Sequence, residues 1–95
     1  MNSMKKIINA RMIVKADEIG NFIYHAEEIS KESNLEPGCN VYKLFQEVGN
    51  STSFIFYEEY ENQSALDFHN SSLHLKRFLS KIRKMLLEKP QVKTY

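Results

Sequence analysis

The order in which strand and helix patterns follow one another is the feature that most constrains this fold. Three segments alternate or run apolar as β-strands do, and a fourth is long enough for a short strand: residues 6–15, 40–48, 53–60 and 92–95. Two segments carry apolar residues at the spacing of a helix stripe: Ile19 to Ile29, and Leu75 to Leu86. The chain therefore reads strand, helix, strand, strand, helix, strand.

Turn and cap residues predict where these elements begin and end. Asp17 offers an N-cap to the first helix, and Glu36-Pro37-Gly38 stops it. Gly49-Asn50-Ser51 predicts a hairpin turn. After the third strand, Asn62-Gln63-Ser64 supplies a turn and a cap for a short helix, and Ser71-Ser72 breaks that helix and caps the last long one.

This order predicts an α+β fold of the split β-α-β, ferredoxin-like type. Its four-stranded antiparallel sheet has both long helices on one face. The 95 residues make a single domain, residues 1–95. Two helices leave one sheet face open, although strands one and three carry large apolar residues on both sides. Leaving Met12, Val14, Ile55 and Tyr57 in water would forgo about 1.5–3 kcal/mol each. A second copy covering the open face, a homodimer, is therefore predicted.

Composition excludes several classes of partner and location. The formal net charge is +1, so no strong field attracts nucleic acid or a membrane surface. Asn9 and Arg11 interrupt the apolar run after Lys5 and Lys6, which argues against a signal peptide. The single Cys39 excludes an internal disulfide and fits a reducing compartment. A cytoplasmic protein that binds neither nucleic acid nor membrane is expected.

Residues 54–78 hold the side chains best suited to chemistry. His69 follows Leu66 and Ala65 by three and four residues on the short helix. It is either a histidine at the edge of the core or a general base, because imidazole titrates near neutral pH. Glu58 leaves a buried strand and needs a partner, so it either orients that imidazole or is an exposed charge at the strand end. The residues alone leave both interpretations open.

Two further polar residues have two interpretations each. Asn9 is polar within a strand that otherwise buries itself, so its amide pairs either across the sheet or with water, or contacts a ligand oxygen. His74 begins the last long helix and is either structural or lines the mouth of a pocket. His69, His74 and Glu58 do not predict a metal site. Two histidines five residues apart across a helix break lack the i, i+4 spacing that directs two rings at one ion.

Several motifs, taken in order, resemble those of the antibiotic biosynthesis monooxygenase family over essentially the whole chain: Glu36-Pro37-Gly38-Cys39, Tyr42, Glu58-x-Tyr60, and His69 and His74 in HNSSLH. The resemblance implies a dimeric α/β barrel and a small oxygenase that needs no cofactor. The haem-degrading branch of the family is similar at Asn9, but it requires a Trp and a haem-ligating His where this chain has Phe68 and Phe78. The sequence contains no Trp, which argues against haem degradation.

The leading hypothesis is therefore a cofactor-independent monooxygenase that oxidises a small aromatic or quinol substrate with oxygen. In it, His69 is the base and Glu58 orients it, while Asn9 contacts a substrate oxygen. Tyr60, Phe68 and Phe78 wall the pocket, and His74 lies at its mouth: these complete the expected substrate-binding residues. Two alternatives stay open. An isomerase of a small phosphorylated sugar would require a cationic pocket wall, such as Arg11, and a non-catalytic ligand-binding dimer would keep the same fold.

Overall fold

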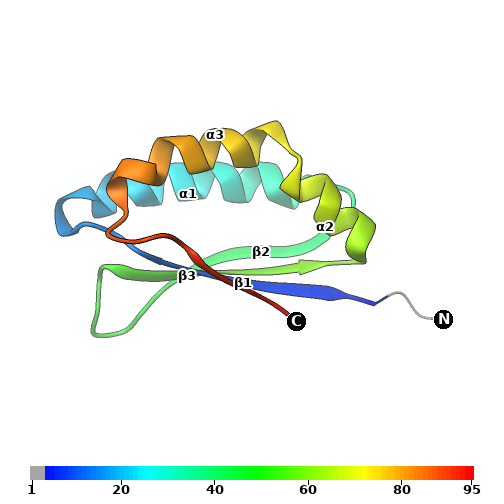
Figure 1. The fold of residues 1–95 in the computed structure, drawn as a ribbon, viewed down its shortest axis with the longest axis horizontal. Coiled ribbons are helices and arrows are strands. Elements are labelled where there is room, and N and C mark those ends of the chain that lie inside the picture. The colour runs from blue at the N-terminus through cyan, green and yellow to red at the C-terminus, as the bar shows by residue number, and fades with distance from the viewer. Residues whose placement is uncertain (1–3) are drawn as a thin grey trace.

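The computed structural model describes residues 4–95 and has the predicted α+β, ferredoxin-like fold. Four strands, β1 (Lys6–Ile13), β2 (Cys39–Gln46), β3 (Ser53–Tyr60) and β4 (Gln91–Thr94), form one antiparallel sheet in the order β2-β3-β1-β4. The helices α1 (Ile19–Asn34), α2 (Gln63–Asn70) and α3 (Leu73–Ile82) lie together on one side of it (Figure 1). Short 3-10 turns, Ala16–Glu18 and Arg83–Met85, precede α1 and follow α3.

The core lies between the helices and the covered face of the sheet. Alternate residues of β1 point into this core. Met12 pairs with Phe54 and Ala10 pairs with Phe56, so these side chains of the two central strands lie on the same side of the sheet. Phe22, Ala26 and Ile29 of α1 and Phe78 and Ile82 of α3 close this core from above: all are buried. A smaller cluster of Ile8, Tyr60 and Leu66 lies at the α2 end.

The sequence assignment of Met12 and Val14 to the open face is wrong. Both side chains are buried under the helices, because they alternate with Arg11 and Ile13 and share a face with Phe54. The apolar residues of the uncovered face are partly buried or exposed: Ile7, Ile13, Val41, Phe45, Ile55 and Tyr57. The open face is therefore mixed, because polar residues such as Asn9, Arg11 and Lys43 lie among these apolar side chains.

Capping residues explain where the helices begin. The Asn62 side chain accepts a hydrogen bond from the Ala65 N–H at 2.9 Å, and the Ser72 hydroxyl accepts one from the Leu75 N–H at 3.2 Å, as predicted. Asp17 does not cap α1 as expected, because it lies within the 3-10 turn and α1 begins two residues later without a side-chain cap. Gly49 has φ +85°, which only glycine adopts readily, so the hairpin turn depends on it. Among residues 4–95, no helix combines the length and apolar character needed to cross a bilayer.

Gly38 allows the loop after α1 to approach α2 closely. A Cβ atom on Gly38 would lie 2.3 Å from the Cβ of Ala65, in the first turn of α2. We expect Gly38→Ala to lower the free energy of unfolding by about 1–3 kcal/mol, because one segment must shift. Urea unfolding measures this loss. Adding Ala65→Gly should restore most of it by removing the clash, and an unrescued double variant would contradict this cause.

Candidate active site

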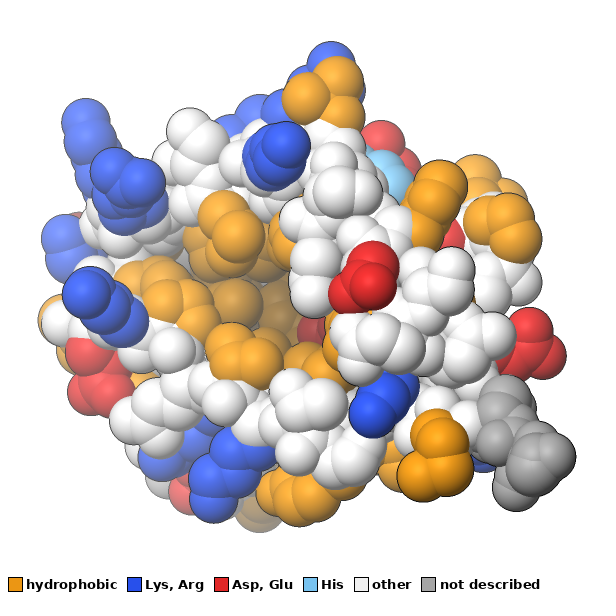
Figure 2. All heavy atoms as spheres, turned by 45° about the vertical axis from the view of Figure 1, so that its right-hand side comes forward, with side chains coloured by type: hydrophobic (Ala, Val, Ile, Leu, Met, Phe, Trp, Pro, Cys, Tyr) orange, Lys and Arg blue, Asp and Glu red, His pale blue; other side chains and the backbone are white. Residues whose placement is uncertain are grey.

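A hollow of about 280 Å³ opens between the covered sheet face, α2, α3 and β4. Figure 2 shows a hollow on this side of the molecule, walled mainly by hydrophobic side chains. Most of its lining is apolar, with contributions from strands and helices: Ile8, Ala10, Met12, Tyr42, Phe56, Leu66, Leu75, Phe78, Leu79, Pro90 and Val92. The polar lining residues are Glu58, His69, Asn70 and Thr94. Such a cavity suits a small, largely apolar ligand with one polar group.

His69 lies at the end of α2, and its ring packs between Tyr42 of the main core and Tyr60 of the smaller cluster. Its side chain is 3% exposed, and its ring centroid lies 5.4 Å from that of Tyr42 and 5.3 Å from that of Tyr60. Burial lowers the pKa of His69, with the nearby Glu36 opposing this effect in part. The imidazole is therefore neutral at neutral pH, which is the form that accepts a proton.

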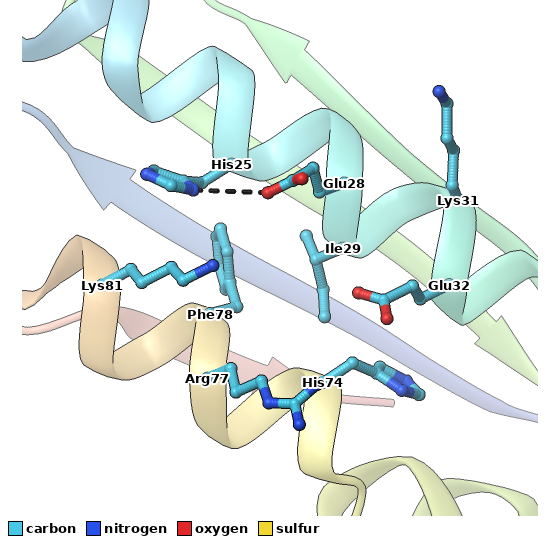
Figure 3. Close-up of a pocket in the computed structure, with 9 residues that line it drawn as sticks. All are labelled: His25, Glu28, Ile29, Lys31, Glu32, His74, Arg77, Phe78 and Lys81. Atoms are coloured by element: carbon cyan, nitrogen blue, oxygen red, sulfur yellow. Dashed lines mark ion pairs between the residues drawn. The ribbon is translucent and has the colours of Figure 1, made fainter.

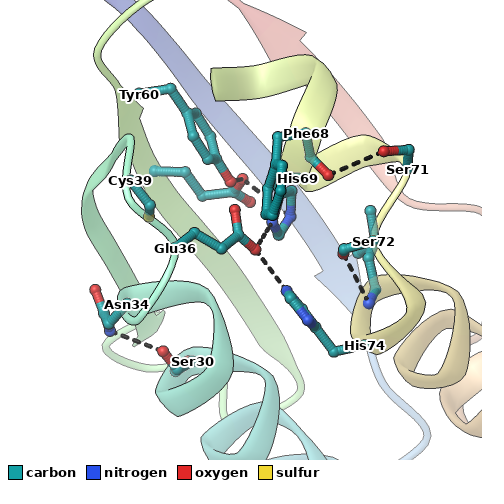
Figure 4. Close-up of polar contacts among 12 residues, drawn as sticks. Ser30, Asn34, Glu36, Cys39, Tyr60, Phe68, His69, Ser71, Ser72 and His74 are labelled. Atoms are coloured by element: carbon teal, nitrogen blue, oxygen red, sulfur yellow. Dashed lines mark hydrogen bonds and ion pairs between the residues drawn. The ribbon is translucent and has the colours of Figure 1, made fainter. Parts of the chain in front are cut away.

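Glu36 orients this imidazole. Its Oε2 lies 2.9 Å from His69 Nδ1, and the carboxylate is 3% exposed (Figure 4). A carboxylate accepts hydrogen bonds, so Nδ1–H is the donor and the lone pair of His69 resides on Nε2. The same Oε2 lies 2.5 Å from His74 Nε2. One buried carboxylate oxygen thus holds two imidazoles.

Glu58 lies on the other side of His69. Its Oε1 accepts a hydrogen bond from the Tyr60 hydroxyl at 2.6 Å and is 4.0 Å from His69 Nε2. Burial raises the pKa of Glu58 to about 7, although the Tyr60 hydrogen bond opposes the shift. Burial and the adjacent Glu58 raise the pKa of Tyr60, so its phenol stays protonated and remains a donor. His69 Nε2 therefore faces a carboxyl group that changes charge near neutral pH.

The structure brings together some of the residues predicted for the site. His69, Glu58 and Phe78 line the hollow. Tyr60 is completely buried beneath it and supports Glu58 rather than forming a wall. His74 lies behind His69, in contact with Glu36, and is not on the lining of the hollow.

Two predicted substrate contacts are not in the site. Asn9 pairs with Tyr57 and Lys93 on the open face, whereas its neighbour Ile8 pairs with Glu58 on the covered face. Strand alternation therefore points the Asn9 amide away from the hollow. Phe68 is 56% exposed, because the position next to His69 on α2 faces outward. Neither residue is part of the lining of the hollow.

Two features were missed or misjudged from the sequence. Glu36 was predicted to help stop the first helix and is part of the motif that resembles the family, but no role in the site was predicted for it. The argument that His69 and His74 cannot converge is also wrong. The break between α2 and α3 turns the second ring back, and the Glu36, His69 and His74 ligand atoms lie within 4.8 Å of one another.

A second, polar hollow of about 360 Å³ runs between α1 and α3 (Figure 3). It is lined by charged and imidazole side chains with an apolar floor: His25, Glu28, Ile29, Lys31, Glu32, His74, Arg77, Phe78 and Lys81. His25 Nδ1 lies 3.5 Å from Glu28 Oε1. This groove is the open side of His74, whose side chain is 18% exposed.

Comparisons with known proteins identify the family. The family model described as antibiotic biosynthesis monooxygenase matches residues 7–81. The Bacillus subtilis protein named "Putative monooxygenase YcnE" is 29% identical over 80 residues, which is 84% of each chain. A conserved protein from Methanosarcina mazei has a TM-score of 0.93 at 24% identity, covering 97% of this chain and 91% of that one. A crystal structure titled antibiotic biosynthesis monooxygenase has a TM-score of 0.89 at 27% identity, covering 97% and 96%. This chain belongs to the antibiotic biosynthesis monooxygenase family.

Proposed function

We propose that the protein is a cofactor-independent monooxygenase for a small, neutral aromatic or quinol, with His69 as the general base. One observation carries the proposal: a buried, neutral imidazole lines an apolar hollow and is held by Glu36 through Nδ1 at 2.9 Å, while its Nε2 lies 4.0 Å from Glu58, another residue of the lining. A base needs this arrangement, because a fixed tautomer leaves the accepting nitrogen free. Family membership supports oxygenase chemistry.

The reaction balances with the substrate as the only reductant. His69 Nε2 takes a hydroxyl proton from the quinol, and the resulting anion is a far better electron donor than the neutral ring. One electron passes to oxygen, and the ring radical and superoxide combine to form a C–O bond. The hydroperoxide then breaks its O–O bond and releases water. Overall, a quinol and one O₂ give a hydroxyquinone and one H₂O, so the ring supplies four electrons.

Substrate charge is limited by the lining of the hollow. None of its lining residues among residues 4–95 is Lys or Arg, and Glu58 adds a potential negative charge. Arg11, the cation that a phosphorylated sugar would require, lies on the open face 3.8 Å from Glu47. An anionic substrate would therefore lose its hydration without a counter-charge. This favours neutral phenols over sugar phosphates.

An oxygen-electrode screen tests the function. Purified protein, treated with EDTA to remove stray metal, is assayed against mono- and bicyclic quinols, with a sugar phosphate as the negative control. We expect one O₂ consumed per hydroxyquinone formed and one atom of ¹⁸O₂ in the product. Oxygen uptake that yields only hydrogen peroxide and unsubstituted quinone, or no uptake above the uncatalysed rate with any quinol, would overturn the proposal.

We further infer that a second copy covers the open sheet face. Phe45 there is 51% exposed, and Ile55, which pairs with both Phe45 and Arg11, lies at the centre of this face. Light scattering after size exclusion should give twice the chain mass. Ile55→Asp should give a monomer, because a carboxylate in place of an apolar side chain would have to lose its hydration at the interface. Val48→Asp, at a loop position that is 98% exposed, is the matched control and should remain dimeric. A monomeric wild type would refute this assembly.

A further inference from the structure

Three potential metal ligands converge behind the hollow. Glu36 comes from the loop between α1 and β2, His69 from the end of α2, and His74 from the first turn of α3. Glu36 Oε2 lies 2.9 Å from His69 Nδ1 and 2.5 Å from His74 Nε2. Figure 4 shows the two rings pointing at this carboxylate from different elements. The three segments thus position two nitrogens and one oxygen around a single point.

The donor set and its burial suit a divalent transition metal ion. Two imidazoles and one carboxylate are a known ligand set for zinc, with bonds of about 2.0–2.2 Å and a fourth position left for water. Tetrahedral bonding places such donors about 3.3 Å apart, so the two contacts to Glu36 would widen by less than about 1 Å, while the two ring nitrogens, which lie within 4.8 Å of each other, would move closer together. The glutamate and both histidines are mostly withdrawn from water, which weakens competition from solvent.

Glu36 also carries a buried oxygen that nothing in residues 4–95 satisfies. Its Oε1 has no hydrogen-bond partner, although the carboxylate is 3% exposed. An unpaired buried acceptor is destabilising and uncommon in native proteins. Coordination of an ion by both carboxylate oxygens, or a water held by that ion, would satisfy it. This observation is independent of the two imidazole contacts.

We propose that Glu36, His69 and His74 form a binding site for a zinc-like divalent ion, and that occupancy of this site switches off His69 as a base. The second part rests on the proposed function. An ion on Nδ1 forces the one proton of the neutral imidazole onto Nε2, the nitrogen that faces Glu58 and the hollow. That nitrogen then has no lone pair for a substrate proton. The ion enters from the polar groove between α1 and α3, which His74 lines with a partly exposed side chain (Figure 3).

Calorimetric titration with Zn²⁺ tests the site, using metal-free protein that carries no histidine tag. Zinc is chosen because it has no redox chemistry and cannot oxidise a quinol. We expect one ion per chain. Glu36→Gln, which keeps the side-chain shape, and His74→Ala should bind at least tenfold more weakly. His25→Ala removes the other histidine of the same groove and should bind as the wild type does.

The outcomes separate a site at Glu36 from zinc held elsewhere. Saturable binding that Glu36→Gln abolishes and His25→Ala retains supports the proposal, provided circular dichroism shows all variants folded. No saturable binding to the wild type overturns it. Equal weakening in His25→Ala and His74→Ala also overturns it, because the ion would then lie in the groove. Co²⁺ in place of Zn²⁺ should give the strong visible absorption of a four-coordinate site.

Oxygen uptake tests the regulatory part. Zinc should inhibit quinol oxidation with the same midpoint as its binding curve, and EDTA should restore the rate. Undiminished uptake at saturating zinc would overturn the switch. If no quinol is oxidised at all, the proposed function fails, while the calorimetric result still decides whether the metal site exists.

Discussion

Replacing His69 with alanine is expected to lower quinol-dependent oxygen uptake by about 10²–10⁴-fold, the usual loss when a general base is removed. The physical reason is specific to Nε2, which is unprotonated because Nδ1–H donates to Glu36 at 2.9 Å. The loss should appear in the turnover number, since the apolar walls that bind the ring remain. Initial rates over a range of quinol concentrations, with EDTA present, measure it.

Folding effects need separate control, because His69 is buried and its removal leaves Glu36 with one partner fewer. His69→Gln keeps an N–H donor for Glu36 but no base, so it should be as inactive as the alanine variant while unfolding closer to the wild type. His25→Ala, in the polar groove, should keep full activity. Wild-type turnover by a folded His69→Gln protein would remove His69 from the mechanism.

Glu58→Gln is expected to stabilise the fold by an amount that grows with pH. Burial raises the pKa of Glu58 from its ordinary 4.5 to about 7. Between these values the folded chain holds a proton that the unfolded chain has released, so the free energy of unfolding falls as pH rises through this window. Glutamine does not titrate and still accepts the Tyr60 hydrogen bond. The variant should match the wild type near pH 4.5 and exceed it by roughly 2–3 kcal/mol at pH 8.

Comparing the wild-type protein with Glu58→Gln isolates the contribution of Glu58 to the pH dependence of stability. The lowered pKa of His69 has the opposite effect, since it makes stability rise with pH through the ordinary histidine range, but both proteins share it. Urea unfolding at several pH values, at one chain concentration and with EDTA present, gives the difference directly. A difference that does not change between pH 4.5 and 8 would show that Glu58 ionises as freely in the folded chain as in the unfolded one.

The fold could be predicted because its determinants are local. Periodicity placed three strands and the long helices, the length of the segment after Pro90 allowed for the fourth strand, and caps at Asn62 and Ser72 were correctly assigned. Which side of β1 faces the helices was not local information. The side chains of residues 7–14 alternate between two faces: Ile8, Met12 and Val14 are on one, and Ile7 and Ile13 are on the other. Only the pairing of Met12 with Phe54 shows which of these two faces the helices cover.

The site was predictable only in its types of residue. His69 and Glu58 were identified from their segment, but the partner of His69 Nδ1 is Glu36, 33 residues earlier. Its contact with His74 spans 38 residues. No pattern within one helix or turn encodes such contacts. Phe68 and His69 are adjacent in sequence, yet a helix turns adjacent side chains by about 100°, so one is exposed and the other buried.

The ring of His69 separates the small cluster around Tyr60 from the main core around Tyr42 and Phe56. A chain selected only for robustness would have no reason to interrupt its interior with ionisable groups, since well-packed hydrocarbon of similar volume often serves a scaffold as well or better. Filling the positions of Glu36, His69 and Glu58 with leucine or methionine, together with Tyr60→Phe so that no buried polar group loses its partner, is thus a route to an inert, more stable version of the domain. Such a scaffold would keep the outer shape while the interior became one continuous hydrophobic body.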